Sequence, residues 1–155
     1  MLKVARGKVK IEDAGFDWKI LGPDVHDADF VAYVSDQDSY NYGGQKCSAQ
    51  SIIFAHENWM KAGFVDKIKA LAERRSLSNL SLSPLISVTN ADIDAHIEKL
   101  LKIPGAKVLF GGAPIDEPNN IPDVYGSYKP TAVFVPIDGM LKNFELCTTE
   151  IFGPF

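Results

Sequence analysis

Strand-like apolar runs alternate with amphipathic helical segments along most of this sequence. The run 51–55 is apolar after its first serine, as in a strand that is buried on both faces of a parallel sheet. In the segment that follows, 57–75, apolar side chains recur every three or four residues, at Met60, Phe64 and Ile68, which indicates a helix with one buried face. The alternation therefore predicts an α/β fold, with a mostly parallel sheet flanked by helices.

Other segments extend the same pattern. Residues 89–92 resemble a helix-capping box, with Asp92 in place of the usual glutamate. Glycine and proline residues separate the segments, as expected at the ends of strands and helices. We expect strands over 9–12, 18–21, 107–110 and 131–135, helices over 24–40 and from the capping box to Pro104, and a long loop over 113–130.

The composition is that of an ordinary globular domain. The chain has 155 residues, a formal net charge of −4 and 46% hydrophobic residues, which together fit one domain. The acidic balance does not suggest nucleic-acid binding, and no apolar run is long enough to span a bilayer. We therefore expect neither a nucleic-acid nor a membrane partner. Two cysteines are too few for a disulfide framework, so a reducing compartment is expected.

The C-terminal residues are unusually apolar for a chain end. Ile151, Phe152 and Phe155 crowd the last five positions, whereas the ends of domains are more often polar and mobile. We therefore expect the sequence to be a piece of a longer protein.

Cys47 is the residue best suited to chemistry. It follows Gly43 and Gly44 closely, and Lys46 directly precedes it. Glycines allow a close approach to the backbone, and a nearby positive charge favours the reactive thiolate. A free cysteine is also commonly a small core residue, but these neighbours favour a nucleophile. Cys147 has no glycine beside it and is interpreted as structural.

The residues alone do not identify a base for this thiol. His26, His56 and His96 carry no motif, and the helical pattern around His96 predicts a surface position. A lone acid such as Glu12 is most often a solvated surface group. A cysteine hydrolase that cleaves esters would need one of these histidines as its base, and no motif supports that hypothesis.

The segment 150–154 combines an acid, an aromatic residue and a Gly-Pro turn. Such a segment suits a loop that faces a ligand. It suits equally an edge strand that ends in a turn. The residues alone leave both interpretations open.

Three segments taken together resemble the motifs of the aldehyde dehydrogenase superfamily, in the same order and spacing. Residues 12–15 are similar to its Glu-x-Gly-Gly loop, residues 44–49 to its catalytic cysteine motif, and residues 150–154 to its Glu-Ile-Phe-Gly-Pro motif. The resemblance covers nearly the whole chain. One departure is Ala14, which replaces the first glycine of the loop and implies a different backbone path beside the nicotinamide.

The resemblance implies a role for each motif residue. Cys47 would attack the aldehyde carbon as a thiolate, and Glu12 would activate the water that hydrolyses the resulting thioester. The implied cofactor is NAD. Glu150 would bind the hydroxyls of its nicotinamide ribose, Phe152 would pack near the nicotinamide, and Gly15 would lie beside the cofactor. The resemblance implies no metal.

Within the superfamily, residues 42–49 are similar to the Δ1-pyrroline-5-carboxylate dehydrogenases, and residues 10–24 to their plant-type branch. These enzymes oxidise glutamate γ-semialdehyde to glutamate in proline catabolism. Ser48 would therefore help to hold the distal carboxylate of that substrate. The resemblance further implies a location in the mitochondrial matrix, a small aldehyde as the partner and a homo-oligomer in the full-length form.

The resemblance also divides the chain into two parts. Residues 1–23 would be the end of the cofactor-binding domain with its Glu-x-Gly-Gly-like loop, and residues 24–155 would be part of the catalytic domain. Most of the Rossmann-like cofactor domain would be missing, so we expect the isolated chain to be inactive. A non-catalytic relative, or an interaction module built on the same α/β core, is the alternative.

Overall fold

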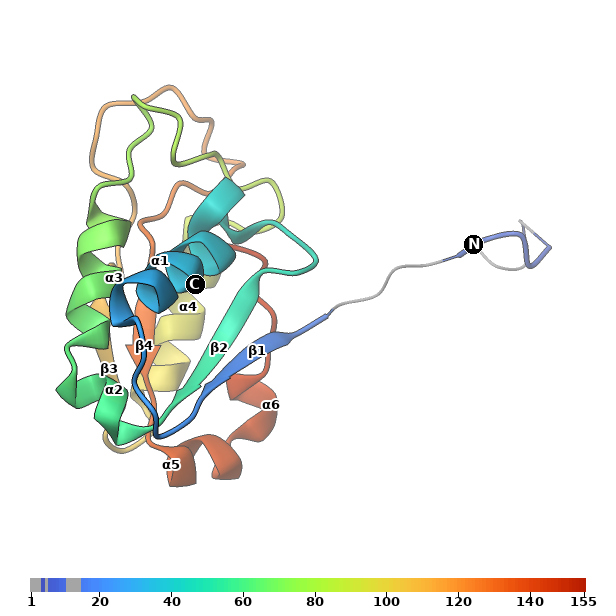
Figure 1. The fold of residues 1–155 in the computed structure, drawn as a ribbon. Coiled ribbons are helices and arrows are strands. Elements are labelled where there is room, and N and C mark those ends of the chain that lie inside the picture. Colours follow the sequence, from blue (N-terminus) through green and yellow to red (C-terminus); the bar gives the residue numbers. More distant parts are fainter. Residues whose placement is uncertain (1–3, 5, 11–14) are drawn as a thin grey trace.

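Helices and strands alternate along the computed structural model, as the sequence predicts (Figure 1). The structure describes residue 4, residues 6–10 and residues 15–155. In chain order the elements are β1 (Asp17–Leu21), α1 (Ala28–Tyr40), the short 3₁₀ helix η1 (Asn41–Gly44), β2 (Gln50–Ala55), α2 (Glu57–Lys61), α3 (Phe64–Glu73), α4 (Asn90–Leu101), β3 (Lys107–Phe110), β4 (Ala132–Phe134), α5 (Ile137–Lys142) and α6 (Phe144–Cys147). The predicted α/β class is confirmed.

The strands of the described residues form two separate pairs, which corrects the expectation of a mostly parallel sheet. β1 and β2 run parallel, with Trp18 beside Ile52 and Leu21 beside Ala55, whereas β3 and β4 run antiparallel. The connections explain the difference. A parallel pair needs a crossover connection, and α1 supplies it between β1 and β2. Only a loop joins β3 to β4, and this permits the antiparallel return.

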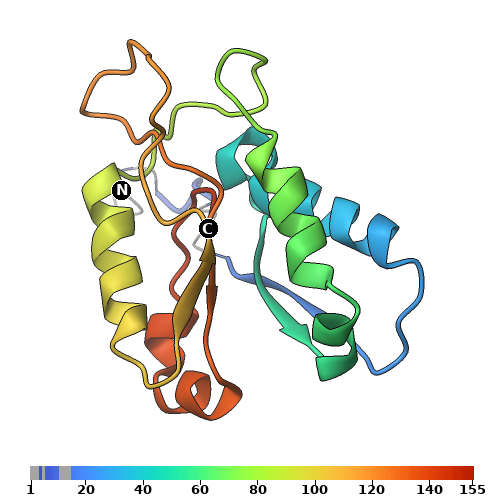
Figure 2. The same cartoon turned by 90° about the vertical axis from the view of Figure 1, so that its left-hand side faces the viewer.

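A largely apolar groove of about 750 Å³ is lined by β2 and by residues 131–135. In Figure 2, α1 and α3 lie with β1 and β2, while α4 lies with β3 and β4. The molecule therefore has two strand–helix layers. The Tyr40 hydroxyl, at the end of α1, joins them by donating a hydrogen bond to the carbonyl of Thr131 at 3.0 Å.

The molecule has two cores. In the first, α1 and α3 pack against the parallel strands, and Phe110 of β3 joins them from the other layer, in a cluster of Leu21, Ala32, Tyr40, Trp59, Phe64, Ile68, Ala72 and Phe110. In the second, Ile93 and Ile97 of α4 pack against Leu85 and Tyr128, and Ile151 and Phe155 contact this cluster. The C-terminal segment is therefore anchored in the second core, whereas the chain that leads to Cys47 leaves the first.

Two helix boundaries differ from the predictions. The single helix expected over 57–75 is interrupted between α2 and α3, because Gly63 has a left-handed backbone with φ of +74°. The helix expected from residue 24 begins at Ala28, where the Asp27 side chain accepts a hydrogen bond from the Phe30 N–H at 3.3 Å. Of the strand expected over 9–12, residues 9 and 10 have no regular structure, and residues 11 and 12 lie outside the described residues.

The predicted capping box at the start of α4 is confirmed. The Thr89 hydroxyl accepts a hydrogen bond from the Asp92 N–H at 3.3 Å, and the Asp92 carboxylate accepts one from the Thr89 N–H at 2.9 Å. The Thr89 hydroxyl also donates a hydrogen bond to the Asp92 carboxylate at 2.6 Å, and this bond, together with the one from the Thr89 N–H, lowers the pKa of Asp92. The surface position predicted for His96 is wrong. His96 is buried on α4, with its ring edge-to-face against Phe155.

Candidate active site

The chain reverses direction in a left-handed turn just before Cys47. Tyr42, Gly43 and Gly44 have φ values of +55°, +65° and +70° in succession. The two glycines adopt this conformation without strain, whereas Tyr42 carries a cost of about 1–2 kcal/mol. The turn leads from the end of α1 to Cys47, whose side chain is exposed. The predicted accessibility of this thiol is therefore observed.

Gly44 packs directly against the C-terminal motif. A Cβ atom at this position would lie 2.1 Å from the carbonyl oxygen of Gly153, far inside van der Waals contact. Gly43 is similarly close to the side chains of Leu85 and Ser83. The sequence indicated that these glycines allow a close approach to the backbone, and the structure shows that the groups which approach are two other segments of the chain.

Substituting Gly44 with alanine is expected to lower the free energy of unfolding by about 2–4 kcal/mol, since the new Cβ would meet backbone and the residue would keep a positive φ. Urea unfolding of the chain, followed by tryptophan fluorescence, measures this change. Gly22→Ala is the matched control, because a Cβ at Gly22 meets nothing within 4 Å. An equal loss in both variants would contradict the assigned contact.

Gly15 connects the turn to the C-terminal motif. Its N–H donates a hydrogen bond to the Glu150 carboxylate at 2.9 Å. A Cβ at Gly15 would lie 3.9 Å from the carbonyl oxygen of Cys47. Three segments that are far apart in the sequence therefore meet around this glycine. Glu12, the acid of the first segment, lies outside the described residues.

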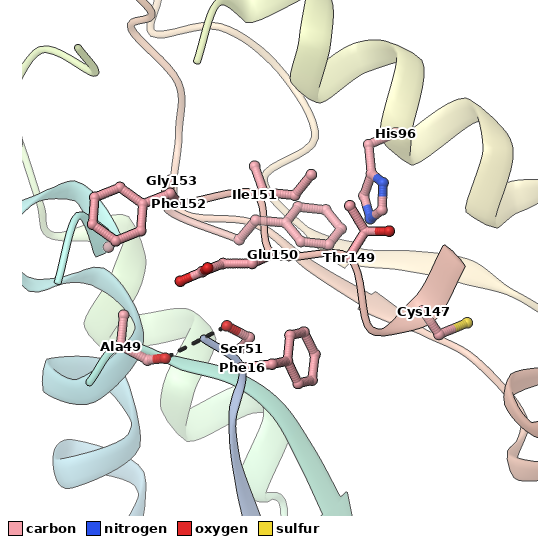
Figure 3. Close-up of a pocket in the computed structure, with 12 residues that line it drawn as sticks. Phe16, Ala49, Ser51, His96, Cys147, Thr149, Glu150, Ile151, Phe152 and Gly153 are labelled. Carbon is pink, nitrogen blue, oxygen red and sulfur yellow. Dashed lines mark hydrogen bonds between the residues drawn. The ribbon is translucent and has the colours of Figure 1, made fainter. Parts of the chain in front are cut away.

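The C-terminal motif forms one wall of a small pocket of about 20 Å³, which is room for about one water molecule. Figure 3 shows Phe16, Glu150 and Phe152 around it. Phe152 has φ of +53°, a conformation that is unfavourable for a residue with a side chain. The hydroxyl of Ser87 donates a hydrogen bond to the Phe152 carbonyl at 2.8 Å and helps to hold this backbone.

The Lys46 side chain is held by the end of α1. Its ammonium group donates a hydrogen bond to the carbonyl of Gln37 at 3.0 Å, on the last turns of α1. Cations near the C-terminal end of a helix are favoured by the helix dipole. Lys46 therefore joins residues 42–46, which we call the cysteine turn, to α1. This hydrogen bond is not evidence that the charge of Lys46 acts on the thiol.

Two of the three histidines are engaged with other parts of the chain, His56 with α2 and His96 with Phe155. The His56 ring accepts a hydrogen bond from the Asn58 N–H at 3.2 Å and caps α2. Burial, together with the charge of Lys99, lowers the pKa of His96. The hypothesis of a histidine-dependent cysteine hydrolase gains nothing from these contacts.

The second cysteine is less suited to nucleophilic chemistry, and the described residues offer no metal site. Cys147 is half-buried at the end of α6, and burial raises the pKa of its thiol, so it is a poorer nucleophile at neutral pH. Both cysteines are free. Within residues 4, 6–10 and 15–155, no group of three or more histidine, cysteine, aspartate or glutamate side chains could hold a metal ion. In the same residues, each helix is too short or too polar to cross a membrane.

The structure brings together most of the residues singled out from the sequence. Gly15, Glu150 and the backbone of Cys47 converge, Phe152 adjoins them, and Ser48 is exposed directly after the thiol. Sequence reasoning missed the segment 83–88, which contacts both the turn and the motif. That segment is a serine-rich connection without a recognisable motif, so no signal pointed to it.

Known proteins match this chain over nearly its whole length. The model of the aldehyde dehydrogenase family matches residues 5–155. A probable aldehyde dehydrogenase of Linum usitatissimum is 58% identical over 152 residues, which are 97% of this chain and 27% of that protein. The mitochondrial Δ1-pyrroline-5-carboxylate dehydrogenase 12A1 of Arabidopsis thaliana is 53% identical over 153 residues, with the same two coverages.

A solved structure shows the same fold. The succinate-semialdehyde dehydrogenase of Burkholderia pseudomallei superposes with a TM-score of 0.75 at 25% identity, over 99% of this chain and 31% of that one. The chain thus spans about a quarter to a third of the proteins that it matches. The expectation of a partial domain is confirmed, and the chain belongs to the aldehyde dehydrogenase family.

Proposed function

We propose that this chain supplies the nucleophile and one edge of the cofactor site in an NAD-dependent oxidation of glutamate γ-semialdehyde to glutamate. The observation that carries the proposal is the convergence of Gly15, Glu150 and the Cys47 backbone, because these residues belong to the three motifs that resemble the family. The domain division at residue 23 is part of the same proposal.

The exposed thiol of Cys47 begins the chemistry. As a thiolate it adds to the aldehyde carbon and forms a C–S bond, while the carbonyl oxygen takes the negative charge and accepts a hydrogen bond from the Cys47 N–H. NAD, held at one end by Glu150 and Phe152, would supply the hydride acceptor for oxidation of that carbon to the thioester level. Water then hydrolyses the thioester on Cys47, with Glu12 as the base, and releases the carboxylic acid and the thiol.

The residues of this chain fit one end of that cofactor. Oxygen Oε2 of Glu150 accepts the Gly15 N–H, whereas Oε1 accepts no hydrogen bond from residues 15–155. A carboxylate held in this way on one oxygen can accept a ribose hydroxyl on the other. Phe152, two residues beyond Glu150, would offer an apolar surface to the nicotinamide.

The substrate class is inferred from the Arabidopsis relative, whose identity of 53% extends over 97% of this chain. Ser48 is exposed beside the thiol and can donate a hydrogen bond to a distal carboxylate. The name of the same relative supports a mitochondrial location. Assembly into homo-oligomers in the full-length form is proposed from the family resemblance alone.

A chimera tests this proposal. The matching segment of the Arabidopsis enzyme is replaced by this chain, and the oxidation of glutamate γ-semialdehyde and of propanal is measured as NADH formation. We expect the Ser48→Ala chimera to lose about 10- to 100-fold in kcat/KM for glutamate γ-semialdehyde, because a hydrogen bond to a charged group is lost. Propanal has no carboxylate, so its kcat/KM is expected to change little.

Two outcomes would contradict the proposal. An equal loss for both aldehydes would remove Ser48 from substrate recognition. A folded chimera that binds NAD but oxidises neither aldehyde would favour the non-catalytic alternative, because the unmodified Arabidopsis enzyme serves as the active control.

A further inference from the structure

The side chain of Gln45 joins the cysteine turn to a segment some forty residues later in the chain. Its amide nitrogen donates hydrogen bonds to the carbonyls of Pro84 and Tyr42, at 3.0 and 3.3 Å. Its amide oxygen accepts one from the Ile86 N–H at 2.8 Å. The amide therefore pairs with residues 84 and 86 as a neighbouring strand would, with one donor and one acceptor.

The partner segment is itself fixed in the second core. Leu85 is buried, and its N–H and C=O both pair with Gly126 at 2.8 Å. Ser87, one residue beyond Ile86, donates the hydrogen bond to the Phe152 carbonyl. Residues 84–87 thus hold the cysteine turn through Gln45 and the C-terminal motif through Ser87. We call these four residues the brace.

Gln45 is the side chain of the turn that can hold Cys47 against the brace. Gly43 and Gly44 have no side chains, and Lys46 is directed to α1. Cys47 itself is exposed, so its thiol is positioned through the backbone of the turn. Attack by a protein nucleophile requires the two reacting atoms to lie within about 3–3.5 Å of each other. A misplacement of about 1 Å can lower the rate about 100-fold.

We propose that Gln45 is a positioning residue, which sets the place of the Cys47 thiol relative to Glu150 and Phe152 by pairing with the brace. The inference rests on the proposed function, since it concerns the same nucleophile. The amide must use its donor and its acceptor at the same time, so that no other side chain of similar size replaces it.

The test is made in the Arabidopsis chimera. Gln45→Met keeps the size of the side chain and removes all three hydrogen bonds, so kcat is expected to fall at least about 10-fold while KM for the aldehyde stays within about 2-fold. Gln45→Glu keeps the acceptor for the Ile86 N–H and loses both donations, so its kcat is expected to lie between those of the parent and of Gln45→Met.

Asn119→Leu is the matched control. The Asn119 amide also donates to one backbone carbonyl, of Glu117, and accepts from one backbone N–H, of Ile121, both at 3.0 Å, but in the exposed loop away from the turn. This variant removes the same kind of bonds and is expected to leave kcat unchanged. Thermal unfolding of all variants verifies that each is folded at the assay temperature.

Two outcomes would overturn the inference. The first is a kcat of Gln45→Met within 2-fold of the parent. If Gln45→Met does not fold, the kcat of Gln45→Glu is used for the same comparison. Another is an equal fall in kcat for Asn119→Leu, which would indicate a general loss of stability. Failure of the proposed function is distinguishable, because the chimera would then keep its activity when Cys47 is replaced.

Discussion

Replacing Asp36 with alanine is expected to lower the free energy of unfolding by about 3–5 kcal/mol, because it leaves a buried guanidinium without its counter-charge. Asp36 lies on α1 and Arg75 follows α3, and their side chains are 0% and 5% exposed. Two hydrogen bonds join them, from Nε at 3.1 Å and from Nη2 at 2.5 Å. Native proteins have a total stability of only about 5–15 kcal/mol, so a loss of this size is large.

A surface ion pair between the same two helices provides the control. Lys67 of α3 bonds Asp29 of α1 at 2.6 Å, but the Asp29 side chain is 84% exposed. Asp29→Ala is therefore expected to cost less than about 1 kcal/mol. Urea unfolding of both variants and of the parent measures the difference.

A second variant separates the charge from the packing. The double variant Asp36→Leu with Arg75→Met removes both charges and fills similar space, so we expect it to recover most of the stability that Asp36→Ala loses. Equal losses from Asp29→Ala and Asp36→Ala would contradict the account. So would a double variant that is less stable than Asp36→Ala.

This pair also bears on the site. Asp36 lies one turn before the end of α1, and the carbonyl of the next residue, Gln37, accepts the hydrogen bond from Lys46. Tyr40 is the last residue of α1 and is buried beside this pair. Burial and the charge of Asp36 raise the pKa of Tyr40. The position from which the cysteine turn begins therefore depends on a buried charge pair far from the thiol in sequence.

Features that depend on neighbouring residues were predicted correctly from the sequence. The strand β2 followed from one continuous apolar run, and the start of α4 from the Thr89 and Asp92 capping pair. The helix expected over 57–75 was wrong because its apolar period continues across Gly63, where the backbone turns left-handed. The spacing of apolar residues indicates which side chains face the core. It does not reveal an interruption of the helix when the apolar side chains on both sides of the interruption still face the core.

Features that depend on distant residues could not be predicted. His96 is buried because Phe155, far along the chain, packs against its ring. The two strand pairs are separate, with a groove between β2 and β4, and the apolar runs that predicted the strands do not indicate which strands pair. The site shows the same division. Its motifs were visible in the sequence, but the partner of Gln45 lies in a connection without any pattern.

Replacing Cys47 with alanine is expected to abolish aldehyde oxidation by the Arabidopsis chimera, with a fall in kcat of more than about 1000-fold. The thiol forms the bond to the substrate carbon in our account, and other groups at the site cannot substitute for it. Cys147→Ala is the matched control, because it removes the other thiol of the chain, at the end of α6. This variant is expected to keep the activity of the parent.

The most direct measurement is NADH formation in a single turnover, with the chimera in excess over glutamate γ-semialdehyde. The account predicts a stoichiometric yield of NADH from the parent and from Cys147→Ala, and none from Cys47→Ala. A stoichiometric yield of NADH from folded Cys47→Ala would contradict the assignment of Cys47 as the nucleophile.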